Sequence, residues 1–273
     1  MSRPDLIRKA NQADLRFSAS VHTHIYTPRL VSLLRSRTTN PRIYSAEEGQ
    51  EKLAILPNEP AGGGRPVGAQ YWSRTSKLAF MDRHRIDLSV VSIANPWLDW
   101  MKDPSEAVKA AHEANEDLVA YCAGEGDENG PGSAFTPGDA RSNFKSPLRS
   151  TDRLRAFGIL PFADGVPVEA LLAAVDQIAS HAPQTLCGAI LGTRGLGRGL
   201  DDPRLEPLWR MVEEKGLMLF LHPHYGIGDV SGGDQSDSLF GARDNGHILP
   251  LALGFPYETA AVSQVLSGAI DPF

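Results

Sequence analysis

The sequence is poor in several features that would place a protein in a specialised class. It has two cysteines, Cys122 and Cys187, in 273 residues, which is too few for a disulfide framework and fits a reducing compartment. No apolar run approaches the roughly 20 residues that a membrane-spanning helix needs. The net charge of −6 argues against a nucleic-acid partner, because such proteins usually carry a basic face. We therefore expect a cytosolic protein without nucleic-acid or membrane partners.

Segments typical of strands and helices alternate along the chain, which predicts a parallel α/β fold. Apolar runs predict strands over residues 15–20, 86–94, 155–161, 186–192 and 217–221. Helices are expected over residues 72–84, 103–123, 166–181 and 202–215, and from Pro256 onward. These five strand-then-helix units are fewer than the eight of a closed barrel. The fold class is therefore predicted to be α/β, of the (β/α)8 TIM-barrel type and incomplete, with about five units.

Residues 25–70 show no clean periodicity and are predicted to form a long irregular segment that serves as a lid or binding loop. One arginine of this segment could clamp a substrate carboxylate, because guanidinium matches carboxylate geometry. For any one of these arginines a solvated surface position is the favoured interpretation, and the candidates are Arg29, Arg35, Arg37 and Arg42.

Residues 124–150 are rich in Gly, Pro, Ser and Asp and lack a hydrophobic pattern. They are predicted to be a flexible surface insertion, not a domain boundary. We therefore expect residues 1–273 to form a single domain.

Two histidine pairs stand at strand ends that are far apart in the sequence. His22 and His24 follow the first strand, and His222 follows the fifth, with His224 two residues later. Side chains two apart on a strand point to the same face, and parallel α/β folds place their chemistry at the carboxyl ends of strands. Imidazole is the commonest metal ligand. A metal site is therefore predicted, with chance proximity as the alternative.

Two further strand ends carry weaker signals. Asn95 follows the second strand, which Pro96 ends, so Asn95 is expected at the barrel mouth as a substrate contact or a turn residue. Residues 193–199 are glycine-rich but lack the Gly-Lys-Ser/Thr of a phosphate-binding loop, which favours a flexible turn.

Longer stretches carry a resemblance to a known family. They are residues 92–97, 191–203, 220–226 and 247–259. With the histidines, they resemble the amidohydrolase superfamily, within it the aminocarboxymuconate-semialdehyde decarboxylase family, and most of all its fungal isoorotate (5-carboxyuracil) decarboxylase branch. The resemblance runs from about residue 16 onward. It implies that His22, His24 and His222 ligate Zn2+ or another divalent metal, and that Asn95 contacts the substrate.

The resemblance also implies a function. It predicts a metal-dependent, non-oxidative carboxy-lyase for a cyclic or unsaturated carboxylic acid, such as 5-carboxyuracil or aminocarboxymuconate semialdehyde. Two alternatives stay open: a hydrolase of an amide or lactone on the same scaffold, and an inactive, truncated relative with only a binding role.

Family members carry two later motifs, a His-Ser/Gly-Gly segment and an Asp on the eighth strand, which would lie beyond residue 273. The catalytic residues therefore stay unknown at this stage. For a chain of this length we expect weak Zn2+ binding, little decarboxylase activity, and possible homo-oligomers through the exposed edge of the fifth strand.

Overall fold

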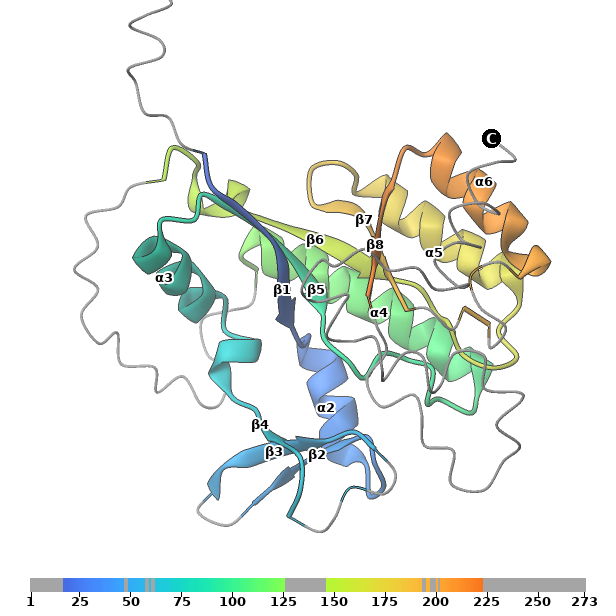
Figure 1. The fold of residues 1–273 in the computed structure, drawn as a ribbon, viewed down its shortest axis with the longest axis horizontal. Helices are drawn as coiled ribbons and strands as arrows, with labels where there is room; N and C mark the ends of the chain where they lie inside the picture. The colour runs from blue at the N-terminus through green and yellow to red at the C-terminus, as the bar shows by residue number, and fades with distance from the viewer. Residues whose placement is uncertain are drawn as a thin grey trace, which may run out of the picture.

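The computed structural model describes residues 17–46, 49–56, 59, 62–125, 146–192, 195–196, 200 and 202–222. Its main element is a parallel sheet of five strands in chain order, with helices between the strands (Figure 1). The strands are β1 (Ala19–Ile25), β5 (Leu88–Ile93), β6 (Leu154–Ile159), β7 (Leu186–Leu191) and β8 (Met218–Leu221). The predicted parallel α/β architecture is confirmed.

The helices begin and end close to the predicted residues. They are α3 (Arg74–His84), α4 (Pro104–Ala123), α5 (Val168–Ser180) and α6 (Glu206–Glu214), the last preceded by the short helix η4 (Pro203–Leu205). The Asp103 carboxylate caps α4 by accepting a hydrogen bond from the Ser105 amide at 2.8 Å, and Pro104 occupies the first turn, where it costs no hydrogen bond. No described helix is long and apolar enough to cross a membrane.

The five-stranded sheet is strongly curled. A flat sheet with strands about 4.8 Å apart would separate β1 from β8 by about 19 Å. Yet the rings of His24, on β1, and His222, directly after β8, have centroids 4.9 Å apart. Side chains of the two edge strands therefore meet across the interior of an open half-barrel. This agrees with the prediction of about five units of a (β/α)8-type barrel.

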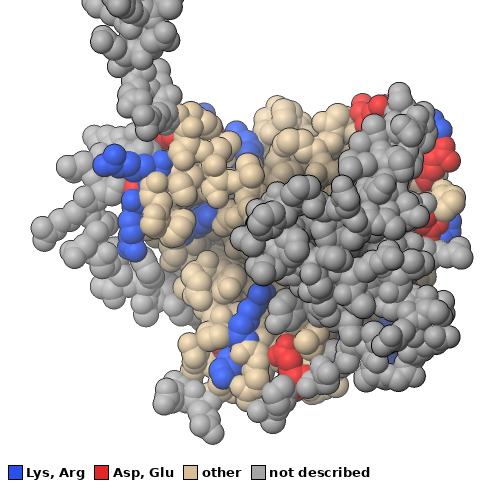
Figure 2. All heavy atoms as spheres, viewed as in Figure 1, with Lys and Arg blue, Asp and Glu red and all other residues tan. Residues whose placement is uncertain are grey.

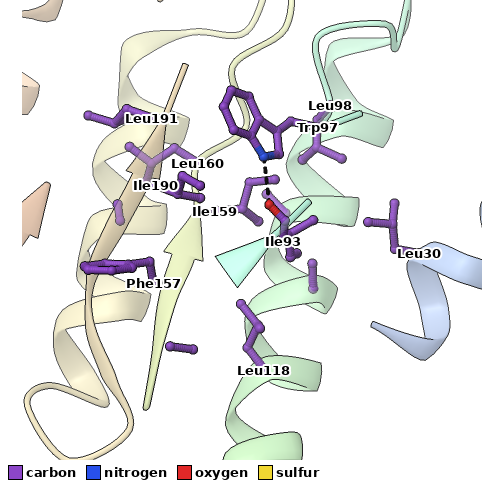
Figure 3. Close-up of a cluster of buried hydrophobic side chains, with 14 of the residues drawn as sticks. Leu30, Ile93, Trp97, Leu98, Leu118, Phe157, Ile159, Leu160, Ile190 and Leu191 are labelled. Atoms are coloured by element: carbon purple, nitrogen blue, oxygen red, sulfur yellow. Dashed lines mark hydrogen bonds between the residues drawn. The ribbon is translucent and has the colours of Figure 1, made fainter. Parts of the chain in front are cut away.

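The core lies where the helices cover the central strands. β5, β6 and β7 are buried along nearly their whole length, whereas β1 and β8 carry several exposed residues. Figure 3 shows part of this core, with Leu118 of α4 among residues from the strands and the loops that follow them. In the loop after β5, the Trp97 indole N–H donates to the Ile93 carbonyl at 3.0 Å (Figure 3). This bond holds the loop against the end of its own strand.

The prediction of an irregular segment over residues 25–70 is wrong. This region contains α2 (Pro28–Ser36), an antiparallel sheet of β2 (Arg42–Ser45), β3 (Glu51–Ala54) and β4 (Arg65–Pro66), and the short helix η2 (Ala69–Tyr71). Pro28 begins α2, because proline fits the first turn of a helix. The strands have four, four and two residues, too short for a periodic pattern.

The predicted first strand is also displaced. β1 runs from Ala19 to Ile25, so His22 and His24 lie within the strand and do not follow it. The apolar-and-small pattern of residues 15–20 suggested a strand, but the parallel pairing with β5 starts at Ala19 and continues to Ile25. The histidines are therefore held by the ladder of the sheet itself.

Several predicted features lie outside the described residues. They include residues 126–145 of the predicted insertion, most of the glycine-rich stretch 193–199, His224, and the helix expected from Pro256. At the described ends of the insertion, Gly124 ends α4, and the Ser146 hydroxyl donates to the Asp87 carboxylate at 3.0 Å. The insertion's flexibility and the single-domain organisation stay predictions.

Candidate metal centre

The structure brings the three sequence-predicted histidines together. One ring nitrogen each from His22, His24 and His222 lies within 4.8 Å of the other two. The Nε2 atoms of His22 and His24 are 3.1 Å apart. The rings stand edge to face, with centroid separations of 4.9 to 5.2 Å. Three imidazoles thus converge on one point at the inner edge of the half-barrel.

Alternation along β1 explains why two of the histidines share a face. His22 and His24 point into the half-barrel, and Thr23, between them, points outward to accept a hydrogen bond from the Lys77 ammonium at 2.7 Å. The third histidine is fixed by the neighbouring strand, because the His222 amide donates to the Leu191 carbonyl at 2.8 Å. The cluster therefore depends on pairing at both edges of the sheet.

Aromatic rings surround the histidines. Phe220, on β8, has its ring centroid 5.3 Å from that of His22 and 5.8 Å from that of His222. Trp97 stands edge-on to His222 at 5.7 Å. These rings limit the orientations open to the imidazoles.

The surroundings of His24 keep its ring neutral. Burial, followed by the positive charges of His222, His22 and Arg65, lowers the pKa of His24 to about 3, although a hydrogen bond with Ser92 acts in the opposite direction. A histidine with such a pKa carries no proton on its lone pair at pH 7. The neutral imidazole is the form that binds a metal ion, so His24 need not lose a proton on binding.

The donor set fits a transition-metal ion. Zinc–imidazole bonds of about 2.0–2.1 Å in a tetrahedral arrangement place two ligand nitrogens about 3.3 Å apart. The 3.1 Å between the two Nε2 atoms is close to this value. Three nitrogen donors suit Zn2+ or a similar ion better than Mg2+ or Ca2+, which prefer oxygen.

A buried polar cluster adjoins the histidines at the carboxyl ends of β1 and β5. The Arg65 guanidinium donates to the Asn95 carbonyl at 2.8 Å and to the Tyr26 hydroxyl, which itself donates to the Asn95 carbonyl. Tyr26 is 1% exposed, and burial raises the pKa of its hydroxyl. Asn95 is where the sequence predicted it, after β5, and it is 9% exposed. A fixed positive charge therefore lies near the three imidazoles.

Arg65 was missed by the sequence analysis, which pointed to four other arginines. Arg29 pairs with Asp117 at 2.7 Å and Arg35 with Glu51 at 2.6 Å. Arg37 stacks on Trp100, and Arg42 donates to the Thr38 carbonyl. These four arginines thus contact residues outside the histidine cluster. The positive charge of Arg65, in contrast, lowers the pKa of His24.

The glycine that precedes Arg65 is the sequence feature that could have pointed to this arginine. Gly64 has φ +90°, and a Cβ there would lie 2.6 Å from the Leu53 carbonyl oxygen. Only glycine tolerates both the conformation and this close approach. Gly64 therefore lets β4 pack on β3, and the next residue in the chain is the arginine that reaches the strand ends.

Comparison with known proteins agrees with this picture. No protein-family model and no curated protein matches the chain. Among solved structures, IDCase from Metarhizium anisopliae, in its apo form, matches with a TM-score of 0.66 and 36% identity, over 94% of this chain and 62% of that chain. A 5-carboxyvanillate decarboxylase from Sphingomonas paucimobilis matches with a TM-score of 0.55 and 17% identity, over 94% of this chain and 64% of that one.

The lower-identity matches bear on the fold alone. They include an amidohydrolase II, with a TM-score of 0.50 and 17% identity over 86% of this chain and 62% of that chain. The chain spans less than two thirds of each of these structures. The resemblance suggested by the sequence motifs is confirmed: the chain is similar to the fungal IDCase over 94% of its length, and it shares the α/β fold of that protein and of the 5-carboxyvanillate decarboxylase.

Proposed function

We propose that His22, His24 and His222 bind a divalent metal ion, with Zn2+ the first choice, and that the chain forms the metal-binding part of a decarboxylase active site. The convergence of three imidazoles from opposite edges of one curled sheet carries this proposal. The 36% identity with IDCase, over 94% of this chain, supports the reaction class.

The residues around the histidines fit a carboxylate substrate. A bound metal ion would act as a Lewis acid that polarises the substrate. Arg65 supplies a guanidinium at the same strand ends, a group that pairs with carboxylates. The Asn95 side chain offers two donors and an acceptor, which suit a polar ring. Together these residues would orient an unsaturated acid with its carboxylate toward the positive charges.

The proposed reaction is loss of CO2. The bond between carbon and carboxylate breaks, its electron pair stays on the carbon, and a proton is added there. Suitable substrates are cyclic or unsaturated acids such as 5-carboxyuracil or aminocarboxymuconate semialdehyde. No described residue is assigned as the proton donor, a role that the family resemblance gives to later strands.

Two alternative functions would keep the same three histidines, but they have less support. A hydrolase of an amide or lactone would need the same three histidines, but the similarity to IDCase favours carboxy-lyase chemistry. An inactive relative with a binding role would keep the histidines without turnover. A homo-oligomer also stays a prediction. It is supported by the exposed apolar residues Val21 and Met218 on the two edge strands.

Metal dependence of CO2 release tests the proposal. The protein is loaded with Zn2+ and mixed with 5-carboxyuracil, and CO2 is measured for the wild type, His22→Ala and a control, His84→Ala, which alters a histidine outside the cluster. We expect the small CO2 release that this chain supports to need the metal, to be lost in His22→Ala and to persist in His84→Ala. Release that is unaffected by a chelator and by His22→Ala, or hydrolysis of amides in its place, would overturn the proposal.

A further inference from the structure

We propose that Ser92 is a positioning residue that holds the His24 ring with its Nε2 atom directed at the other two histidines. The inference rests on the proposed metal centre, because it concerns one of its ligands. Neither the sequence motifs nor the histidine cluster itself assigns a role to this side chain.

The position of Ser92 is set by the sheet. In the parallel pairing of β1 and β5, His24 and Ser92 are register partners. The Ser92 hydroxyl oxygen lies 3.0 Å from His24 Nδ1. Ser92 is 1% exposed, on a strand whose residues are buried from Ser89 to Ile93. The hydroxyl is therefore presented to the imidazole by a buried strand that is paired on both sides.

The hydrogen bond has a chemical consequence at the opposite side of the ring. A neutral imidazole has one N–H and one lone pair. If Nδ1–H donates to the Ser92 hydroxyl, the lone pair is on Nε2, which lies 3.1 Å from Nε2 of His22. Partners of this kind commonly fix the tautomer of metal-binding histidines.

The other tautomer of His24 shows why a hydrogen-bond partner at Nδ1 is needed. With the proton on His24 Nε2, the two histidines would hydrogen bond to each other across the same 3.1 Å. That bond would use the lone pair of His22 and leave none on the facing atom of His24. Ser92 stabilises the tautomer of His24 in which the lone pair is on Nε2, the atom that faces His22.

The same strand offers a matched control. Ser89 is also a serine of β5, is 0% exposed, and its hydroxyl has no hydrogen-bond partner among the described residues. Ser89→Ala makes the same chemical change at similar burial, three residues away and without contact to His24. Ser92→Thr is the conservative variant, because it keeps the hydroxyl.

The first test measures Zn2+ affinity by competition with a chromophoric chelator. We expect Ser92→Ala to weaken binding by about 10- to 100-fold, a typical loss for removal of such a partner. Ser89→Ala and Ser92→Thr should stay close to the wild type. Equal affinities for Ser92→Ala and Ser89→Ala would overturn the proposal.

The second test needs no bound metal. Long-range 1H–15N spectra of the metal-free protein at neutral pH identify which nitrogen of His24 carries the proton. We expect Nδ1–H in the wild type and a shift toward Nε2–H in Ser92→Ala. A wild-type proton on Nε2, or no change in the variant, would refute the role of Ser92. Failure of the wild type to bind Zn2+ would instead refute the proposed metal centre, while these spectra still decide the question for Ser92.

Discussion

The two sides of the candidate site are held by different kinds of structure. The three histidines lie on or beside β1 and β8, strands that pair directly with β5 and β7 of the buried centre of the main sheet. Arg65 lies on β4, a strand of two residues in the small antiparallel sheet. The imidazole side therefore depends on the curvature of the whole half-barrel, whereas the guanidinium side depends on one tight turn.

This difference implies that the two sides can be disturbed separately. Loss of a histidine removes a ligand but leaves Arg65 on its own sheet. Loss of Arg65, or distortion of the turn before it, leaves the main sheet and its histidines in place. Metal binding and carboxylate binding should thus respond to different substitutions.

The largest effect is expected for His222→Ala. It removes one of three ligands, so Zn2+ affinity should fall by more than the roughly 10- to 100-fold that loss of an outer-shell partner costs. Calorimetric titration with Zn2+ measures the change, with His84→Ala as the control. Retention of wild-type affinity by His222→Ala would show that the metal, if bound, lies elsewhere.

Arg65→Gln should weaken the binding of a carboxylate without weakening Zn2+ binding, because Arg65 is no metal ligand and its positive charge lies near the imidazoles. Hydrogen bonds to charged groups are worth about 1.5–3 kcal/mol, which corresponds to a loss of about 10- to 150-fold in affinity for 5-carboxyuracil. Arg35→Gln is the control, since that arginine pairs with Glu51. Equal losses of affinity in both variants would show that Arg65 has no specific role in carboxylate binding.

Gly64→Ala tests the turn that carries Arg65. Both Gly62 and Gly64 have positive φ, but a Cβ at Gly62 meets nothing within 4 Å, whereas one at Gly64 lies 2.6 Å from the Leu53 carbonyl oxygen. Gly62→Ala should cost about 1 kcal/mol of unfolding free energy, and Gly64→Ala on the order of 1–3 kcal/mol more. Urea denaturation distinguishes them, and equal costs would contradict the close packing of β4 on β3.

The last prediction concerns Lys77, behind the histidine strand and outside both sides of the site. Burial lowers the pKa of Lys77 from 10.5 to about 8. Between these two values the unfolded chain binds more protons than the folded chain, so the contribution of Lys77 to stability rises with pH in this range and is at its least favourable below pH 8. Relative to Lys77→Met, the wild type should gain stability from pH 8 to 10.5. Parallel pH profiles of melting temperature would contradict the lowered pKa.

Much of the histidine side could be predicted from the sequence, because its signals are local. Apolar runs marked the central strands, and histidine spacing within a strand marked the shared face. The position of Asn95 followed from the strand that precedes it. These features depend on periodicity and on the rule that parallel strands expose their carboxyl ends together.

The guanidinium side of the site could not be predicted, because the residues that form it follow no periodic pattern in the sequence. β4 is too short to show alternation, and the reach of Arg65 depends on a contact between Gly64 and Leu53 that spans two strands. The partnership of Ser92 with His24 depends on the register between β1 and β5. Register between strands that are far apart in the chain leaves no local pattern for a single sequence to show.

X-ray absorption spectroscopy of the Zn2+-loaded protein tests the central claim most directly. The claim is that His22, His24 and His222 bind one metal ion together. We expect a first shell containing about three imidazole nitrogens at about 2.0–2.1 Å, and one imidazole fewer in His222→Ala. A first shell dominated by oxygen, or one that is the same in His222→Ala as in the wild type, would contradict the claim.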